Sequence, residues 1–274
     1  MKTTKTVADL VPVFIQSRED RNLRATTLVN YGIWARWMIS HWGHRKVAKI
    51  KRDEITSLAN SKSRNHAQVT QCFFRWLIEE RHLPRLFDFG KLPRPRRSEE
   101  QTICYLTPAD TRILLQELKK AYRPGFILGL YAGLRPYEMC RIEWSSIHIA
   151  DRRIKIEARV SKIRRPRMIE GVPPILWQLL KPYAQKEGRV MPGDTDDHAV
   201  HRYLHERGRV QEWSGLDLGH DVLRHTFATH YSALTGDACR CAKILGHYKL
   251  QTLIAHYDGV TTKAQARDYF RKQA

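Results

Sequence analysis

The sequence contains no long apolar segment and no cysteine pattern typical of metal binding. No uninterrupted apolar run approaches the roughly 18 residues of a membrane-spanning helix, and the opening residues MKTTKTVADL lack the apolar stretch of a secretory signal. The five cysteines are odd in number and form no C-x-x-C pair. Cys239 and Cys241 have no second pair at zinc-finger spacing, so we expect both to be small buried residues. These absences predict a cytoplasmic protein with no membrane segment and no metal.

Acidic residues are also scarce relative to basic ones. The chain has 48 Lys and Arg residues against 28 Asp and Glu residues, which gives a formal net charge of +20. The excess runs along the whole chain and is not confined to one tail. A charge of this size favours a polyanionic partner, above all nucleic acid, although an ordinary cationic protein has the same composition.

The first third of the chain has the pattern of amphipathic helices. Apolar residues recur every three or four positions and stop at Gly43, and a second such series follows. The two series are Leu28, Tyr31, Ala35, Met38, Ile39 and Trp42, then Val69, Phe73, Trp76 and Leu77. The segment KLPRPRRSEE at 91–100 contains two prolines, many charges and one apolar residue, which is typical of an interdomain linker. We therefore predict a helical domain at 1–93, a linker at 94–100 and a second domain at 101–274.

The second domain is predicted to be mainly α with a small β-hairpin. Thr107, Pro108 and Asp110 have the order of an N-cap, a first helical residue and a capping acid, so a helix should begin there. Residues 126–134 are apolar on all sides and indicate a buried helix that ends before Arg135. From 147 to 156 the apolar period becomes two, which indicates a hairpin, and the polar segment 161–167 should lead into a third short strand. Helical patterns return after residue 175.

The residues with the most distinctive chemistry are two arginines, a histidine and a tyrosine. Arg135 lies in GLRPYE, and the segment 221–257 contains Arg224, the sequence LGH ending at His247, and Tyr257. An arginine binds two phosphate oxygens at once, so two arginines can neutralise the charge that develops on a five-coordinate phosphorus. A tyrosine that attacks a phosphodiester keeps the bond energy in a phosphotyrosine ester, so resealing needs neither ATP nor a metal. The set therefore indicates DNA strand exchange without a cofactor.

These motifs resemble those of the tyrosine recombinase (phage integrase) family. GLRPYE is similar to its first arginine motif, SKIRRPRMI to the segment with its hairpin lysine, VLRHTFATH to its second arginine motif, and LGH with the following tyrosine to its C-terminal motif. All four occur in the family's order within 101–274, and the helical 1–93 region resembles the core-binding, DNA-clamping domain in pattern and length. The resemblance implies site-specific recombination of double-stranded DNA by a homo-tetramer on two duplexes, in some systems with accessory DNA-bending proteins. It also implies that the segment 262–274 docks on a neighbouring protomer.

The resemblance also implies a role for each motif residue. Arg135 and Arg224 are expected to bind the scissile phosphate, and His247 to donate a hydrogen bond to one of its oxygens. Lys162 is expected to protonate the departing 5′ oxygen, and Tyr257 to be the nucleophile. The acid after the first arginine, Glu138 here, is expected to hold neighbouring groups in place. Arg164, Arg165 and Arg167 stand near Lys162, and the sequence allows them equally to be contacts to the DNA backbone. His225 and His230, which lie within the second arginine motif on the same expected helix as Arg224, are expected to be structural.

Two features depart from the family pattern. Asp221 stands where the family usually has the histidine that exchanges a proton with the tyrosine, so either Asp221 or its neighbour His220 is the possible acid/base. Nine residues after His247 the chain has His256, and Tyr257 follows one position later than usual. Tyr248 and Tyr269 are therefore alternative nucleophiles.

Two alternative functions stay open for this chain, a non-enzymatic DNA-binding regulator on the same scaffold and a type IB topoisomerase. Formation of a covalent protein–DNA adduct separates the regulator from the enzymes.

Overall fold

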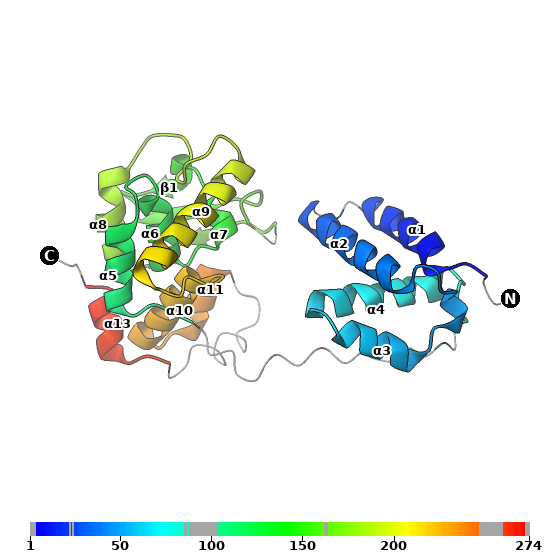
Figure 1. Ribbon diagram of the computed structural model, residues 1–274. Helices are drawn as coiled ribbons and strands as arrows, with labels where there is room; N and C mark the ends of the chain where they lie inside the picture. The colour runs from blue at the N-terminus through cyan, green and yellow to red at the C-terminus, as the bar shows by residue number, and fades with distance from the viewer. Residues whose placement is uncertain are drawn as a thin grey trace. The chain divides into compact units, whose positions relative to one another are not determined.

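The chain forms two compact units, Met1–Gln101 and Thr102–Ala274. The structure is a computed structural model, which describes residues 4–21, 23, 25–84, 87, 104–161, 164–246 and 260–271 (Figure 1). The predicted linker at 94–100 lies outside the described residues. Among the described residues, no helix combines the length and the apolar character that a membrane crossing requires.

The first unit is helical, as its periodicity predicted. Its helices are α1 Val7–Glu19, α2 Ala25–Trp42, α3 Arg52–Asn60 and α4 Arg64–Glu79. Its core is rich in aromatic rings: Phe14 on α1 meets Trp34 of α2 at 5.6 Å and Phe73 of α4 at 5.3 Å between ring centroids, both edge-to-face. These rings give the small unit a hydrophobic core of its own.

The second unit consists of helices around a small antiparallel sheet. The helices are α5 Pro108–Glu117, α6 Arg123–Ala132, α7 Pro136–Met139, α8 Ile175–Leu180, α9 Asp196–Ser214, α10 Val222–Thr235, α11 Ala238–Leu245 and α13 Lys263–Tyr269. The strands β1 Ile147–His148, β2 Arg153–Ile156 and β3 Arg167–Ile169 pair in that order. Ile147 pairs with Ile154, and Ile154 pairs with Ile169, so the buried residues share one face of the sheet. The predicted hairpin and third strand are thus confirmed.

The helix before Arg135 is buried as predicted and ends in a tight turn. All residues of α6 from Pro124 to Ala132 are buried. Gly133 ends the helix with φ +67°, a left-handed conformation that favours glycine. A Cβ on Gly133 would lie 2.5 Å from Leu245 Cδ2 and 2.7 Å from Phe227 Cδ1. The close approach packs the end of α6 against α10 and α11, so it helps to set where Arg135 emerges.

One expectation about the C-terminal part differs from the structure, and another is not tested by it. Cys241 is buried, but Cys239 is exposed, because α11 is amphipathic and Cys239 lies on its solvent side. The helix α13 packs on α10 and α5 of its own unit. Its Tyr269 is fully buried, and the hydroxyl donates to Leu130 O at 2.6 Å. Residues 263–269 thus pack within their own chain here, and the docking of 262–274 on a neighbouring protomer stays a prediction.

Candidate active site

Arg135 stands at the start of a short helix and presents a partly accessible guanidinium. It is the N-cap of α7, and the Glu138 side chain accepts a hydrogen bond from the Arg135 backbone N at 3.1 Å. The Arg135 side chain is 17% exposed, and its guanidinium makes one longer contact of 3.4 Å with Glu138 Oε1. Arg135 is therefore placed rigidly by its backbone, while most of its guanidinium hydrogen-bonding capacity is not used by Glu138.

Arg224 is buried and ties three segments together. From α10 its guanidinium donates to Gly133 O at 2.7 Å and to Leu245 O at 2.6 Å. Burial is the largest cause that lowers the pKa of Arg224, to about 9, and the positive charge of Arg135 is the next largest. The negative charge of Glu138 acts in the opposite direction. The structure thus brings Arg135 and Arg224 into one electrostatic cluster, as the sequence predicted. A negative ligand that reaches this cluster would stabilise both charges.

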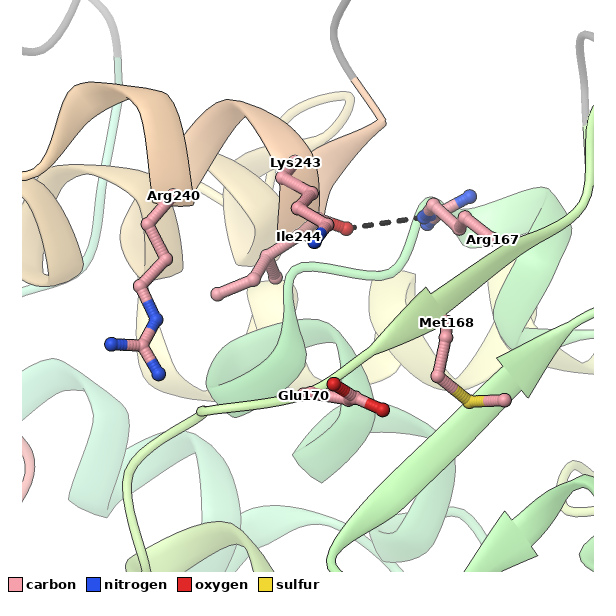
Figure 2. Close-up of a pocket in the computed structure, with 6 residues that line it drawn as sticks. All are labelled: Arg167, Met168, Glu170, Arg240, Lys243 and Ile244. Carbon is pink, nitrogen blue, oxygen red and sulfur yellow. Dashed lines mark hydrogen bonds between the residues drawn. The ribbon is translucent and has the colours of Figure 1, made fainter.

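Arg167 is a member of this cluster that sequence reasoning missed. Its two terminal nitrogens donate to the two carboxylate oxygens of Glu138, each at 2.7 Å. Its Nε donates to Ile244 O at 3.1 Å, the bond drawn in Figure 2. In this structure Arg167 is thus engaged by Glu138 and Ile244, and contact of Arg167 with the DNA backbone, one of the alternatives that the sequence left open, stays untested. Strand parity is the signal that was available, because Arg167 lies on the same face of β3 as the buried Ile169.

Glu138 is a buried carboxylate that stays ionised. Its side chain is 0% exposed. Burial by itself raises its pKa, but the hydrogen bonds and charge of Arg167, with help from the Arg135 backbone and the Arg224 charge, outweigh burial and lower the pKa below its ordinary value. Glu138 therefore holds neighbouring groups, as predicted. Three arginines surround one carboxylate, so the cluster keeps a net positive charge that favours an anion.

A pocket of about 450 Å³ adjoins this cluster between β3 and α11 (Figure 2). Its lining consists of Arg167, Met168, Glu170, Arg240, Lys243 and Ile244. Arg167 belongs both to the pocket wall and to the ion pair with Glu138. The pocket therefore borders the cluster at its Arg167 side.

The turn before Arg224 contains a residue in an unusual backbone conformation, Asp221. Asp221 caps α10 with φ +61°, in the left-handed region that a non-glycine residue rarely adopts. Its Oδ2 lies 3.2 Å from His220 Nδ1, and its Oδ1 is buried without a hydrogen-bond partner among the described residues. The His220 side chain is 81% exposed, against 24% for Asp221. The two candidate acid/base residues thus form a pair in which His220 is the accessible member.

Three of the five predicted catalytic residues lie outside the described residues. These are Lys162, His247 and Tyr257, and Tyr248, an alternative nucleophile, is also outside. The other alternative, Tyr269, is fully buried, and burial raises its pKa well above the ordinary value, so its hydroxyl is poorly suited to attack DNA. His230 is structural as predicted, because its Nε2 bonds to Leu106 O at 3.0 Å and its ring stacks on Tyr269 at 4.1 Å.

The chemistry available to the described site is anion binding by arginine. In the part of the chain that the structure describes, no group of three or more His, Cys, Asp or Glu residues is arranged to hold a metal ion. The paired arginine charges near Gly133 and Leu245 suit the oxygens of a phosphate, whose charge grows when a nucleophile attacks.

Comparison with known proteins shows the family and the fold of the chain. Residues 105–263 match the model of the phage integrase family. The Tn1549 transposon integrase, solved in complex with a circular intermediate DNA, is similar in structure with a TM-score of 0.69, at 16% identity over 96% of this chain and 98% of that chain. A lambda integrase dimer bound to a core site gives 0.72, at 18% identity over 90% and 97%. The XerH site-specific recombinase bound to its difH substrate gives 0.66, at 13% identity over 91% and 80%. Comparison with curated proteins gives no match.

Proposed function

Because the chain belongs to the phage integrase family and is therefore a site-specific tyrosine recombinase, we propose that Arg135 and Arg224 bind the scissile phosphate of DNA while Tyr257 attacks it. The observation that carries this proposal is the cluster of Arg135 with the buried Arg224, fixed on Gly133 O and Leu245 O. Two guanidinium groups held in place before the reaction stabilise the charge that develops on the phosphate oxygens. The negative charge on the phosphate oxygens is largest where the phosphorus becomes five-coordinate, so the two arginines lower the barrier more than they strengthen substrate binding.

The proposed reaction exchanges one phosphate ester for another. The Tyr257 oxygen forms a bond to phosphorus, the bond from phosphorus to the 5′ oxygen breaks, and a 3′-phosphotyrosine results. Lys162 supplies the proton that the departing 5′ oxygen needs, and His247 donates a hydrogen bond to a phosphate oxygen. Attack by the 5′ hydroxyl of another strand reverses these steps, returns the tyrosine and joins the strands. No bond energy is lost, so no cofactor takes part.

His220 is the group proposed to accept the proton that Tyr257 loses when it attacks the phosphate. The Asp221 carboxylate next to His220 Nδ1 favours the tautomer with a proton on that nitrogen, which leaves Nε2 able to accept one. The exposure of His220 supports this assignment, because an acid/base group must reach the substrate. Asp221, with one buried oxygen and a strained backbone, orients the histidine.

The assembly is proposed from the charge of the chain and from its relatives. The net charge of +20 suits a duplex held along much of the chain, with the helical unit Met1–Gln101 as the DNA clamp and Thr102–Ala274 as the catalytic unit. Lambda integrase has been solved as a tetramer bound to a Holliday junction, and we propose the same number of protomers on two duplexes here. A cytoplasmic location and accessory DNA-bending proteins stay predictions. No described feature favours the regulator or the topoisomerase.

The test is covalent trapping on a suicide substrate that carries the end sequence of the host element. The wild-type protein should form a covalent adduct, and Tyr257→Phe should fold and bind DNA without forming one. Tyr269→Phe is the matched control, because it removes the same atom from a buried tyrosine and should keep the adduct. Mass spectrometry that finds the nucleotide on Tyr248 or Tyr269 would refute the assigned nucleophile. Absence of any adduct on a cognate site would favour the regulator, and relaxation of supercoils without site preference would favour the topoisomerase.

A further inference from the structure

Glu138 lies between two arginines and pairs unequally with them. Arg167 holds both carboxylate oxygens at 2.7 Å in a bidentate pair. Arg135 makes only one side-chain contact to the same carboxylate, at 3.4 Å. A bidentate pair at short distance is much stronger than a single long contact, so Glu138 is bound mainly to Arg167.

Arg135 is nevertheless the nearest alternative partner for this carboxylate. It lies three residues before Glu138 at the start of α7, and its backbone N already donates to Glu138 Oε2. Glu138 is fully buried, and a buried carboxylate that loses its cation is strongly driven to find another. Without Arg167, the guanidinium of Arg135 is the cation already in contact with Glu138.

We propose that Arg167 keeps the guanidinium of Arg135 available to the scissile phosphate by occupying the carboxylate of Glu138. Arg167 is thus a positioning residue, which acts through Glu138 and Arg135 and does not itself contact the reacting atoms. The proposal rests on the proposed function in one respect, namely that Arg135 binds the phosphate.

The surroundings of Arg167 fix it in this role. Its Nε donates to the carbonyl oxygen of Ile244 (Figure 2). The carbonyl of the next residue, Leu245, accepts from Arg224. A Cβ on Gly246 would lie 3.0 Å from Arg167 Cδ, so the end of α11 closes tightly over the side chain. Three hydrogen bonds and this packing leave the Arg167 side chain 11% exposed, with its guanidinium directed at Glu138. The same side chain therefore links β3, α7 and the end of α11.

The experiment compares Arg167→Gln, the double variant Arg167→Gln with Glu138→Gln, and each of these combined with Arg135→Ala. The measured quantity is the single-turnover rate of adduct formation at saturating DNA, corrected for the folded fraction from thermal denaturation. Arg167→Gln should slow cleavage by about 10-fold to 100-fold, because Arg135 becomes paired with Glu138. Adding Glu138→Gln should recover about tenfold or more of that rate, because no carboxylate remains to hold Arg135.

A second readout reports directly on Arg135. In the wild-type background Arg135→Ala should cost about 100-fold or more, whereas in the Arg167→Gln background it should cost much less, since Arg135 is already withdrawn. A purely structural role for Arg167 would leave the cost of Arg135→Ala the same in both backgrounds. The matched control is Arg153→Gln, which breaks an exposed ion pair with Glu170 at 3.3 Å in the same sheet and should change neither rate.

The outcomes that overturn the proposal differ from those that overturn the proposed function. Equal costs of Arg135→Ala in both backgrounds, or a double variant no faster than Arg167→Gln, would refute the role of Arg167. Normal cleavage by Arg135→Ala alone would instead refute phosphate binding by Arg135. If Arg167→Gln does not fold, the same comparison is made with Arg167→Lys, whose single ammonium leaves one carboxylate oxygen for Arg135. Its loss should be smaller, and Glu138→Gln should again recover it; a loss that Glu138→Gln does not reduce would refute the proposal.

Discussion

Replacing Arg224 with alanine is expected to reduce both stability and cleavage, whereas replacing Arg135 is expected to reduce cleavage alone. The difference follows from the hydrogen-bond partners and the exposure of each guanidinium. Arg224 is buried and donates to two backbone carbonyls, those of Gly133 and Leu245. Arg135 makes one side-chain contact of 3.4 Å and is partly exposed.

The stability loss can be estimated from these contacts. Each buried carbonyl left without a donor costs about 1–3 kcal/mol, and removal of a buried charge beside Arg135 offsets part of the sum, so Arg224→Ala should cost about 2–4 kcal/mol. For a unit of this size that lowers the melting temperature by roughly 4–16 °C. Arg135→Ala should cost less than about 1 kcal/mol, because a long single contact contributes little.

The cleavage loss should be similar for the two variants. Under the proposed function each variant removes a guanidinium that binds the scissile phosphate, so each should cost on the order of 100-fold or more in rate. DNA affinity should change far less, because the excess of Lys and Arg along the chain shares the binding to the backbone. The assays are thermal denaturation of the full chain, DNA titration, and adduct formation on the suicide substrate at a temperature where all variants are folded.

Two results would refute this reasoning. Normal cleavage by Arg135→Ala or Arg224→Ala would show that the replaced guanidinium does not stabilise the transition state. An Arg224→Ala variant with wild-type stability would show that the hydrogen bonds of Arg224 to Gly133 O and Leu245 O contribute less to the free energy of unfolding than estimated. Arg153→Ala, which removes an exposed arginine from the same unit, should be unchanged in both assays and serves as the control.

Three further outcomes are expected. The pKa of Glu138 is lowered from 4.5 in the folded protein, so the stability that its ionised form adds is present above pH 4.5 and is lost as the pH falls through the folded pKa. Glu138→Gln should therefore flatten the acid side of a curve of unfolding free energy against pH, measured by urea denaturation. An unchanged slope would contradict the lowered pKa. Tyr269→Phe leaves Leu130 O without its donor and should lower stability by about 1–2 kcal/mol in the same assay, so an equally stable variant would contradict that bond. Limited proteolysis should cut within 94–100 and release a C-terminal fragment that keeps its helical circular dichroism, whereas a first cut inside 126–134 would contradict the domain division.

The sequence by itself was sufficient to predict the main helices and strands of the second unit and to show the order of the motifs. The buried helix before Arg135, the capping box at Thr107 and the hairpin through Ile154 were all predicted, because period and caps are local properties that a short segment carries alone. The motif order also placed Arg135 and Arg224 in one site, and the structure brings them together. Lys162, His247 and Tyr257 stay predictions.

Only the tertiary structure decided which partner each polar side chain found. Arg167 lies in a run of similar basic residues, and nothing local distinguishes it from Arg164 or Arg165 except the strand face that it shares with Ile169. Its partners Glu138 and Ile244 lie 29 and 77 residues away in the chain, and their contact depends on how β3, α7 and α11 pack. Hydrogen bonds and ion pairs act over a few ångströms in space and have no period along the sequence, so the network around Arg135 and Arg224 could be seen only after the chain was folded.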